Sequence, residues 1–83
     1  MRILVAEDER DLNRLLAEAL KRAGYSVDCC FDGALALDYL RGAAYEAAVL
    51  DIMMPKLDGY EVLRRLRETG NETPVIFLTA RSG

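Results

Sequence analysis

The 83-residue chain has no histidine, only two cysteines and two prolines, and a small negative net charge of −3. Without histidine and without a Cys-x-x-Cys pair, the sequence offers no zinc site. Cys29 and Cys30 are adjacent, and neighbouring strand residues point to opposite faces, so we expect free thiols in a reducing compartment. The acidic balance argues against direct binding to bare nucleic acid, which needs a basic protein face.

Long apolar runs are also absent. No run reaches the length that spans a bilayer, and Glu7 and Asp8 come too early for a secretory signal segment. We therefore expect a cytoplasmic protein without a membrane partner. Apolar residues make up 52% of the chain and charged residues 30%, which is typical of a globular protein. The length allows a single domain, assigned here to residues 1–83.

Short apolar segments alternate with amphipathic ones along the chain. The predicted strands span residues 3–6, 25–31, 45–52 and 75–79. The predicted helices lie between them: one capped by Asp11 or Asp8 and ended by Gly24, one over residues 34–40, and one that begins at Asp58-Gly59 and ends at Gly70-Asn71. Strands separated by helices predict an α/β fold with a parallel sheet and right-handed crossovers.

Each predicted helix carries one apolar stripe, which we expect to face the sheet. In the first helix the residues recur at steps of three and four: Leu12, Leu15, Leu16, Ala19 and Leu20. The second helix has Leu37 and Leu40, and the third has Tyr60, Leu63 and Leu66, with Val62 beside them.

Two of the predicted strands end on acidic residues. Residues 3–6 run into Glu7-Asp8-Glu9, and the third strand ends at Asp51. If these strands are parallel neighbours, their carboxylates share the edge where open α/β sheets bind ligands. Two unit charges about 5 Å apart repel by about 3 kcal/mol at an effective dielectric near 20, so the cluster must take up protons or a hard cation. Mg²⁺ suits this site, since it binds one or two carboxylates and keeps waters that phosphoryl oxygens can replace.

A carboxylate beside Mg²⁺ can also attack phosphorus and form an aspartyl phosphate. Asp51 is the better nucleophile because it stands alone at the end of a central strand, whereas Glu7 and Asp8 are adjacent and suited to the metal. The hydroxyl of Thr79, at the end of the fourth strand, could hydrogen-bond that phosphate. Each feature also has an ordinary structural interpretation: acidic residues favour helix starts, an aspartate can cap a strand end, and threonine is common in strands.

Three separated motifs together resemble the receiver domain of two-component response regulators. They are Ile3-Leu4-Val5-Ala6-Glu7-Asp8-Glu9, Val49-Leu50-Asp51-Ile52-Met53-Met54-Pro55 with Asp58-Gly59, and Pro74-Val75-Ile76-Phe77-Leu78-Thr79-Ala80. The resemblance covers the whole chain. It implies a flavodoxin-like, three-layer αβα fold with strand order 2-1-3-4 that lacks the final helix-strand-helix. The third helix, residues 59–67, is similar to the branch that carries a winged-helix DNA-binding domain.

The resemblance also implies roles for the matching residues. Asp51 would accept a phosphoryl group from a sensor histidine kinase, with Thr79 as the switch hydroxyl and the Ala80 backbone amide in contact with the phosphoryl group. The protein would control transcription, and DNA would be bound only by a domain outside this sequence. A receiver domain of this kind is not classed as an enzyme.

The metal site implied by the resemblance holds Mg²⁺. Asp8 and Asp51 would bind the ion directly, and Glu7 would bind it through water. The backbone carbonyl of Met53 would be a further ligand.

The sequence departs from the family by stopping after the fourth strand. Receiver domains continue with a fourth helix, a fifth strand bearing a lysine, and a fifth helix, so we expect the N-terminal portion of a longer regulator. The fourth strand then becomes a sheet edge, and we expect it to pair with a second copy, by edge pairing or strand exchange, or to leave the fragment poorly stable. Two other functions stay open. One is an interaction fragment that does not support phosphotransfer; the other is an aspartyl-phosphate hydrolase, whose Asp-x-Asp pattern Asp51-Ile52-Met53 does not match.

Overall fold

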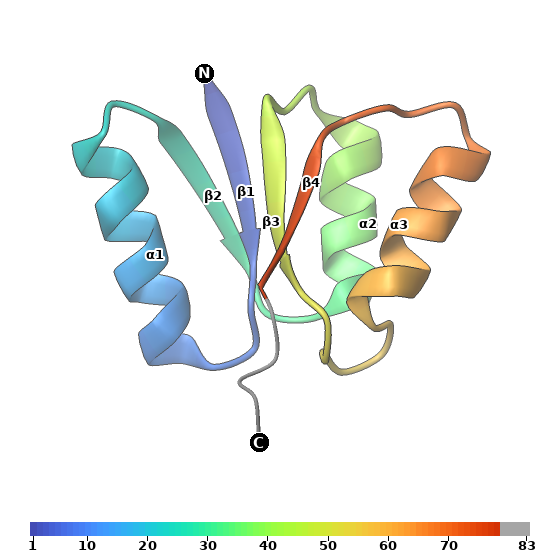
Figure 1. Ribbon diagram of the computed structural model, residues 1–83, viewed down its shortest axis with the longest axis horizontal. Coiled ribbons are helices and arrows are strands. Elements are labelled where there is room, and N and C mark those ends of the chain that lie inside the picture. The colour runs from blue at the N-terminus through green and yellow to red at the C-terminus, as the bar shows by residue number, and fades with distance from the viewer. Residues whose placement is uncertain (79–83) are drawn as a thin grey trace.

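The computed structural model describes residues 1–78, which form a four-stranded sheet with three helices (Figure 1). The strands are β1 (Arg2–Ala6), β2 (Ser26–Cys30), β3 (Ala47–Asp51) and β4 (Val75–Leu78), and the helices are α1 (Arg10–Arg22), α2 (Gly33–Gly42) and α3 (Gly59–Glu68). All strand pairs are parallel, in the order β2-β1-β3-β4. The predicted fold class and strand order are therefore confirmed.

The sheet lies between α1 on one side and α2 with α3 on the other (Figure 1). Alternate strand residues such as Leu4 and Leu50 are fully buried against α2 and α3, because successive side chains of a strand point to opposite faces. The members of this core are Leu4, Ala6, Cys30, Ala36, Leu37, Leu40, Ala48, Leu50, Met54, Val62 and Leu66. Ile3 and Val5 are also buried, and the same alternation directs them toward α1.

Every helix begins with an acidic cap residue whose side chain accepts a backbone hydrogen bond, which satisfies one of the free amides of the first turn. Asp32 accepts from Leu35 N at 2.8 Å, and Asp58 accepts from Glu61 N at 2.8 Å. At α1 the cap is Glu9, which accepts from Leu12 N at 2.6 Å. The predicted caps Asp11 and Asp8 are therefore wrong: Asp11 lies within the first turn, where its charge still favours the helix dipole.

The predicted stripe of α1 differs from the buried face. Leu12 and Leu15 remain 41% and 60% exposed, whereas Asn13 and Ala17 are buried. Leu16 and Leu20 are half-buried, and Ala19 is exposed. The buried face of α1 is therefore centred on Asn13 and Ala17 rather than on the leucines. In α3 the buried face also differs from the predicted stripe: Tyr60 is exposed, while Val62 and Leu66 are buried in the core.

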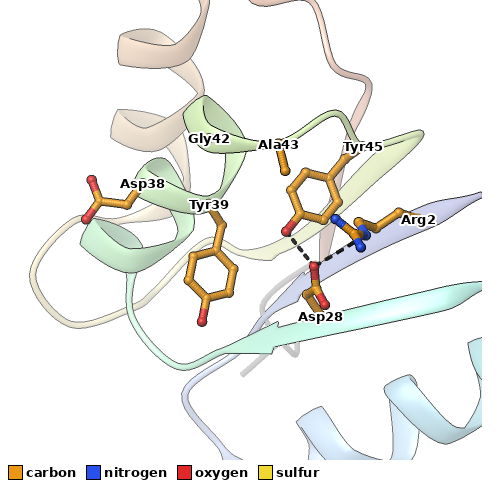
Figure 2. A pocket seen from close by; sticks show the side chains of 7 residues that line it. All are labelled: Arg2, Asp28, Asp38, Tyr39, Gly42, Ala43 and Tyr45. Atoms are coloured by element: carbon orange, nitrogen blue, oxygen red, sulfur yellow. Dashed lines mark hydrogen bonds and ion pairs between the residues drawn. The ribbon is translucent and has the colours of Figure 1, made fainter.

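At the amino ends of the strands, Tyr45 and Arg2 converge on Asp28 from different segments (Figure 2). The Tyr45 hydroxyl donates to Asp28 Oδ2 at 2.7 Å, and Arg2 Nε lies 3.7 Å from the same oxygen. These side chains line a shallow hollow of about 410 Å³ and tie the β2 edge to the segment before β3. Cys29 and Cys30 are free thiols in the structure. Among the residues described, no helix has the length and apolar character needed to cross a bilayer.

Candidate metal centre

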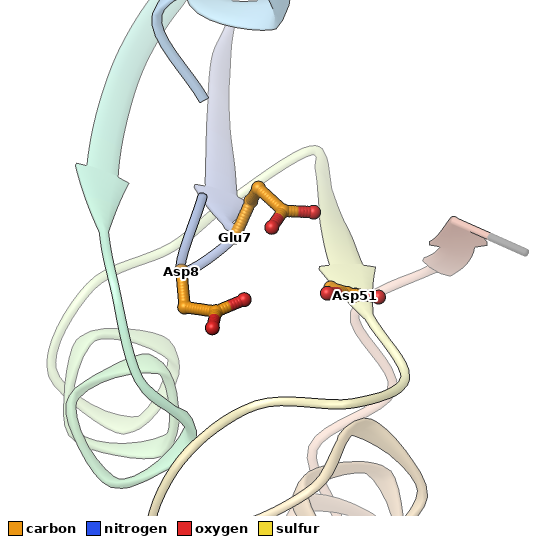
Figure 3. Close-up of side chains that lie close together, drawn as sticks. All are labelled: Glu7, Asp8 and Asp51. Atoms are coloured by element: carbon orange, nitrogen blue, oxygen red, sulfur yellow. The ribbon is translucent and has the colours of Figure 1, made fainter. Parts of the chain in front are cut away.

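The parallel register of β1 and β3 brings acidic residues together at the carboxyl edge of the sheet. Ala6 pairs with Leu50, so the residues that follow, Glu7 and Asp51, are neighbours at this edge. On the other side of β3, Asp51 pairs with Leu78, the last described residue of β4. Figure 3 shows Glu7 and Asp8 leaving the end of β1 with Asp51 facing them from the end of β3.

Three carboxylates converge here, as the strand ends predicted. One oxygen from each of Glu7, Asp8 and Asp51 lies within 4.8 Å of the other two. Glu7 is only 4% exposed, Asp8 is exposed, and Asp51 is half-buried. They line a hollow of about 530 Å³, together with Glu9, Leu12 and Met53. The cluster is thus open to solvent on one side and closed by protein on the other.

The surroundings of Glu7 disfavour the ionised form of its carboxyl group. Burial raises the pKa of its carboxyl above the ordinary value, and the negative charges of Asp51 and Asp8 raise it further. The hydrogen bond from Glu9 N to Glu7 Oε2, 2.8 Å long, opposes the shift because it stabilises the ionised form. A divalent cation beside these oxygens would remove the repulsion that the bare cluster carries.

Asn13 holds the backbone of this site, although it was not among the residues predicted from the sequence. Its Nδ2 donates to the carbonyls of Glu7 and Cys30, each at 3.0 Å. The side chain is 1% exposed. An asparagine among the leucines of an amphipathic helix was the available signal, since a buried amide must find partners in the fold.

The loop after β3 fixes the other half of the site. Gly59 N donates to Ile52 O at 2.7 Å, and a Cβ at Gly59 would lie 2.6 Å from the Asp51 carbonyl oxygen. Only glycine allows α3 to start so close to the end of β3. Met53 N lies 3.4 Å from Asp51 Oδ1, which orients the aspartate side chain. In the same loop Lys56 adopts a positive φ of 73°.

Of the remaining predicted site residues, the structure describes Met53 but not Thr79 or Ala80. Met53 lines the hollow beside the carboxylates, and binding through its carbonyl stays a prediction. Thr79 and Ala80 lie outside the described residues. Of the predicted group, the structure therefore brings together Glu7, Asp8, Asp51 and Met53.

The donor set fits a hard cation. Among residues 1–78, the side chains that converge at the cluster all offer carboxylate oxygens as metal ligands. Carboxylates suit Mg²⁺ or Ca²⁺, whereas softer transition metals favour imidazole or thiolate. The open side of the hollow leaves room for water or for oxygens of a phosphoryl group. A carboxylate that shares the site with the cation is also placed to act as a nucleophile toward phosphorus.

Comparison with known proteins agrees with this geometry. Residues 3–83 match the family described as the response regulator receiver domain. The chain belongs to this family. It is 52% identical over 82 residues to the transcriptional regulatory protein TctD of Salmonella typhimurium, a match that covers 99% of this chain and 37% of TctD. The predicted resemblance to the transcriptional branch of the family is confirmed by such relatives, and the chain spans well under half of their length.

Solved receiver domains share the fold. The response regulator TrrA of Thermotoga maritima, solved in complex with Mg²⁺ and BeF, has a TM-score of 0.90 and 38% identity, covering 98% of this receiver chain and 70% of TrrA. TrrA in complex with the histidine kinase ThkA has a TM-score of 0.88 and 38% identity, covering 99% and 71% of the two chains. The flavodoxin-like architecture predicted from the motifs is therefore confirmed.

Proposed function

We propose that this receiver chain is the Mg²⁺-dependent phosphoacceptor of a two-component phosphorelay, and that Asp51 receives the phosphoryl group from a sensor histidine kinase. The observation that carries the proposal is the approach of the Glu7, Asp8 and Asp51 carboxylate oxygens to within 4.8 Å at the carboxyl edge of a parallel sheet. The receiver family and the TrrA complexes with Mg²⁺–BeF and with a histidine kinase support it. We assign residues 1–83 to the N-terminal portion of one receiver domain.

The residues that would hold Mg²⁺ are Glu7, Asp8, Asp51 and, through its backbone carbonyl, Met53. The bound ion would offset the negative charge of the cluster and of incoming phosphoryl oxygens. Glu7 supplies a fixed charge at the closed side of the hollow, since it is buried and held by Glu9 N. Asp8 is exposed and stands on the open side, where the ion would enter.

Asp51 has the position that a nucleophile needs. Its half-buried side chain lies at the end of a central strand, and Met53 N lies near one of its oxygens. In the transfer a carboxylate oxygen of Asp51 forms a bond to phosphorus while the phosphorus–nitrogen bond of the kinase phosphohistidine breaks. The released histidine nitrogen takes up a proton from solvent, and the product is an aspartyl phosphate.

We assign two further contacts to the residues that follow β4. The hydroxyl of Thr79 would hydrogen-bond a phosphoryl oxygen, and the backbone amide of Ala80 would donate to the same group. The support is the β3–β4 register, in which Asp51 pairs with Leu78 immediately before Thr79.

We place the output of the signal outside these residues. The chain spans 37% of TctD, so transcription control and any DNA binding belong to parts of a longer protein. We class the chain as a phosphoacceptor rather than an enzyme. A cytoplasmic location is part of the proposal, since a reducing compartment suits the free Cys29 and Cys30.

The test is phosphorylation of the chain by acetyl phosphate, followed by intact-mass and peptide-mass measurement. We expect one added phosphoryl group on Asp51, formed with Mg²⁺ and lost when the metal is chelated. The Asp51→Asn variant should take up none, and Asp38→Asn, which changes an exposed aspartate on α2, should behave as the parent. Mg²⁺ binding without modification of Asp51 would overturn phosphotransfer and favour the interaction fragment.

A further inference from the structure

We infer that Asn13 is a positioning residue of the metal centre, a role that rests on the proposed function and specifies how the fold aims the Glu7 and Asp8 carboxylates. Asn13 lies in the first turns of α1 and is 1% exposed. Its Nδ2 donates to the carbonyl oxygens of Glu7 and Cys30, both at 3.0 Å. One amide group therefore joins the helix to the ends of β1 and β2.

The carbonyl that Asn13 holds belongs to the peptide unit between the two acidic residues. Fixing the Glu7 carbonyl limits rotation about the backbone bonds that flank this peptide, and these rotations direct the Asp8 side chain. Glu7 N donates to Cys30 O at 3.2 Å, so the same strand end is fixed from both sides. A change in the orientation of this peptide would move the Glu7 and Asp8 carboxylates relative to Asp51.

The contact closes a ring of hydrogen bonds around the acidic segment. Glu9 N donates to the Glu7 carboxylate at 2.8 Å, and the Glu9 carboxylate accepts from Leu12 N at 2.6 Å at the start of α1. Asn13, one residue further on, returns to the Glu7 carbonyl. The cap of the helix, the acidic segment and the buried amide thus form one hydrogen-bonded unit that holds ligands of the proposed ion.

In the structure Asn13 uses its donor and not its acceptor. Asn13 Oδ1 is buried and, among residues 1–78, has no hydrogen-bond partner, and an unsatisfied buried acceptor opposes the gain from the two donated bonds. A leucine of similar size would remove this acceptor but would also leave the Glu7 and Cys30 carbonyls without the Asn13 donor. The donor is what the site needs, and partners of metal ligands typically change metal affinity by 10- to 100-fold when they are removed.

The experiment compares Asn13→Leu with Asn71→Leu by Mg²⁺ titration calorimetry and by urea unfolding. Asn71, in the loop between α3 and β4, is a matched control. Its Nδ2 also donates to a backbone carbonyl, that of Leu40, at 3.1 Å. We expect Asn13→Leu to weaken Mg²⁺ binding about tenfold. Asn71→Leu should bind Mg²⁺ with the affinity of the parent chain, even if the substitution lowers the free energy of unfolding.

The outcomes separate this inference from the proposed function. If the parent chain shows no saturable Mg²⁺ binding, the proposed function fails. If the parent binds Mg²⁺ and folded Asn13→Leu binds it equally well, Asn13 only packs the core and the inference is overturned.

A measurement on the parent chain covers the case in which Asn13→Leu does not fold. We expect the side-chain NH₂ resonances of Asn13 to shift during Mg²⁺ titration, in step with the Glu7 amide, while those of Asn71 stay fixed. Movement of the Glu7 and Asp8 amides without movement of the Asn13 NH₂ group would overturn the inference.

Discussion

The carboxylate oxygens of Glu7 and Asp51 lie within 4.8 Å of each other although the two residues follow different strands. The β1–β3 register, with Ala6 beside Leu50, creates this approach. Because Glu7 is buried and Asp51 is half-buried, water screens their repulsion less than it would on an open surface. The fold therefore keeps like charges together at one edge, and a bound cation is the simplest compensation.

Replacing Glu7 with glutamine should stabilise the metal-free chain at neutral pH. Burial and the neighbouring carboxylates raise the pKa of Glu7 in the folded state, so the folded chain retains this proton to higher pH than the unfolded chain does. Stability then falls as pH rises through the window between the ordinary pKa and the raised one. Glu7→Gln removes that fall and should gain up to about 3 kcal/mol above the window.

Urea unfolding from pH 4 to pH 8, with and without Mg²⁺, measures this effect. Glu18→Gln is the control, since Glu18 is exposed on α1. Mg²⁺ should stabilise the parent more than Glu7→Gln, because a ligand stabilises the state that binds it. A Glu7→Gln variant that is less stable than the parent at pH 7 without metal would contradict the account of Glu7.

Substituting Gly59 should disturb both the fold and the site. An alanine Cβ would lie 2.6 Å from Asp51 O and 3.1 Å from a ring carbon of Phe77. We expect Gly59→Ala to lose about 1–3 kcal/mol of unfolding free energy, as overpacked cores do, and to weaken Mg²⁺ binding as the end of β3 shifts. Gly42→Ala, with no atom within 4 Å of the added carbon, should change stability by about 0.5 kcal/mol or less. Equal stability of the two variants would show that the approach at Gly59 is not tight.

The fold and the site were predictable to different depths. The strands ending at Ala6 and Asp51 stand out as apolar runs that meet carboxylates, so the fold class and the acidic edge follow from local patterns. Asn13 and Gly59 act through contacts with distant segments, and no local pattern shows which carbonyl a buried amide will reach. The prediction of the buried face of α1 was wrong for a related reason. Small residues such as Ala17 allow a helix to pack close to a sheet, whereas a prediction from hydrophobicity alone favours Leu15.

Tyr45 should give the chain a dependence on alkaline pH. Burial, together with the hydrogen bond to Asp28, raises the pKa of Tyr45 to about 12. The contribution of protonated Tyr45 to folding stability is complete below the ordinary tyrosine pKa of about 10. It declines as pH rises toward the folded-state pKa of about 12. Tyr45→Phe should lower the free energy of unfolding by about 1 kcal/mol at pH 8. In urea unfolding it should also show a weaker decline in stability between about pH 10 and 12 than the parent. The same slope in Tyr39→Phe and Tyr45→Phe would contradict this role.

The β4 edge should mediate self-association of the 83-residue chain. Within the described sheet β4 is an edge strand. Its sequence, Val75–Leu78, is entirely apolar, and Ile76 is 56% exposed. Such an edge favours pairing with another chain, so light scattering on a dilution series should show dimers that dissociate as concentration falls. Ile76→Lys should shift the equilibrium toward monomer, and a parent that is monomeric and well folded at micromolar concentration would contradict the prediction.

The central claim, that Glu7, Asp8 and Asp51 hold a divalent cation at one edge of the sheet, is tested most directly by following backbone amide resonances during Mg²⁺ titration. We predict saturable shifts centred on Glu7, Asp8, Asp51 and Met53, absent at Tyr45 at the amino end of the sheet and abolished by Asp51→Asn. An absence of saturable shifts, or shifts centred away from the ends of β1 and β3, would contradict the account.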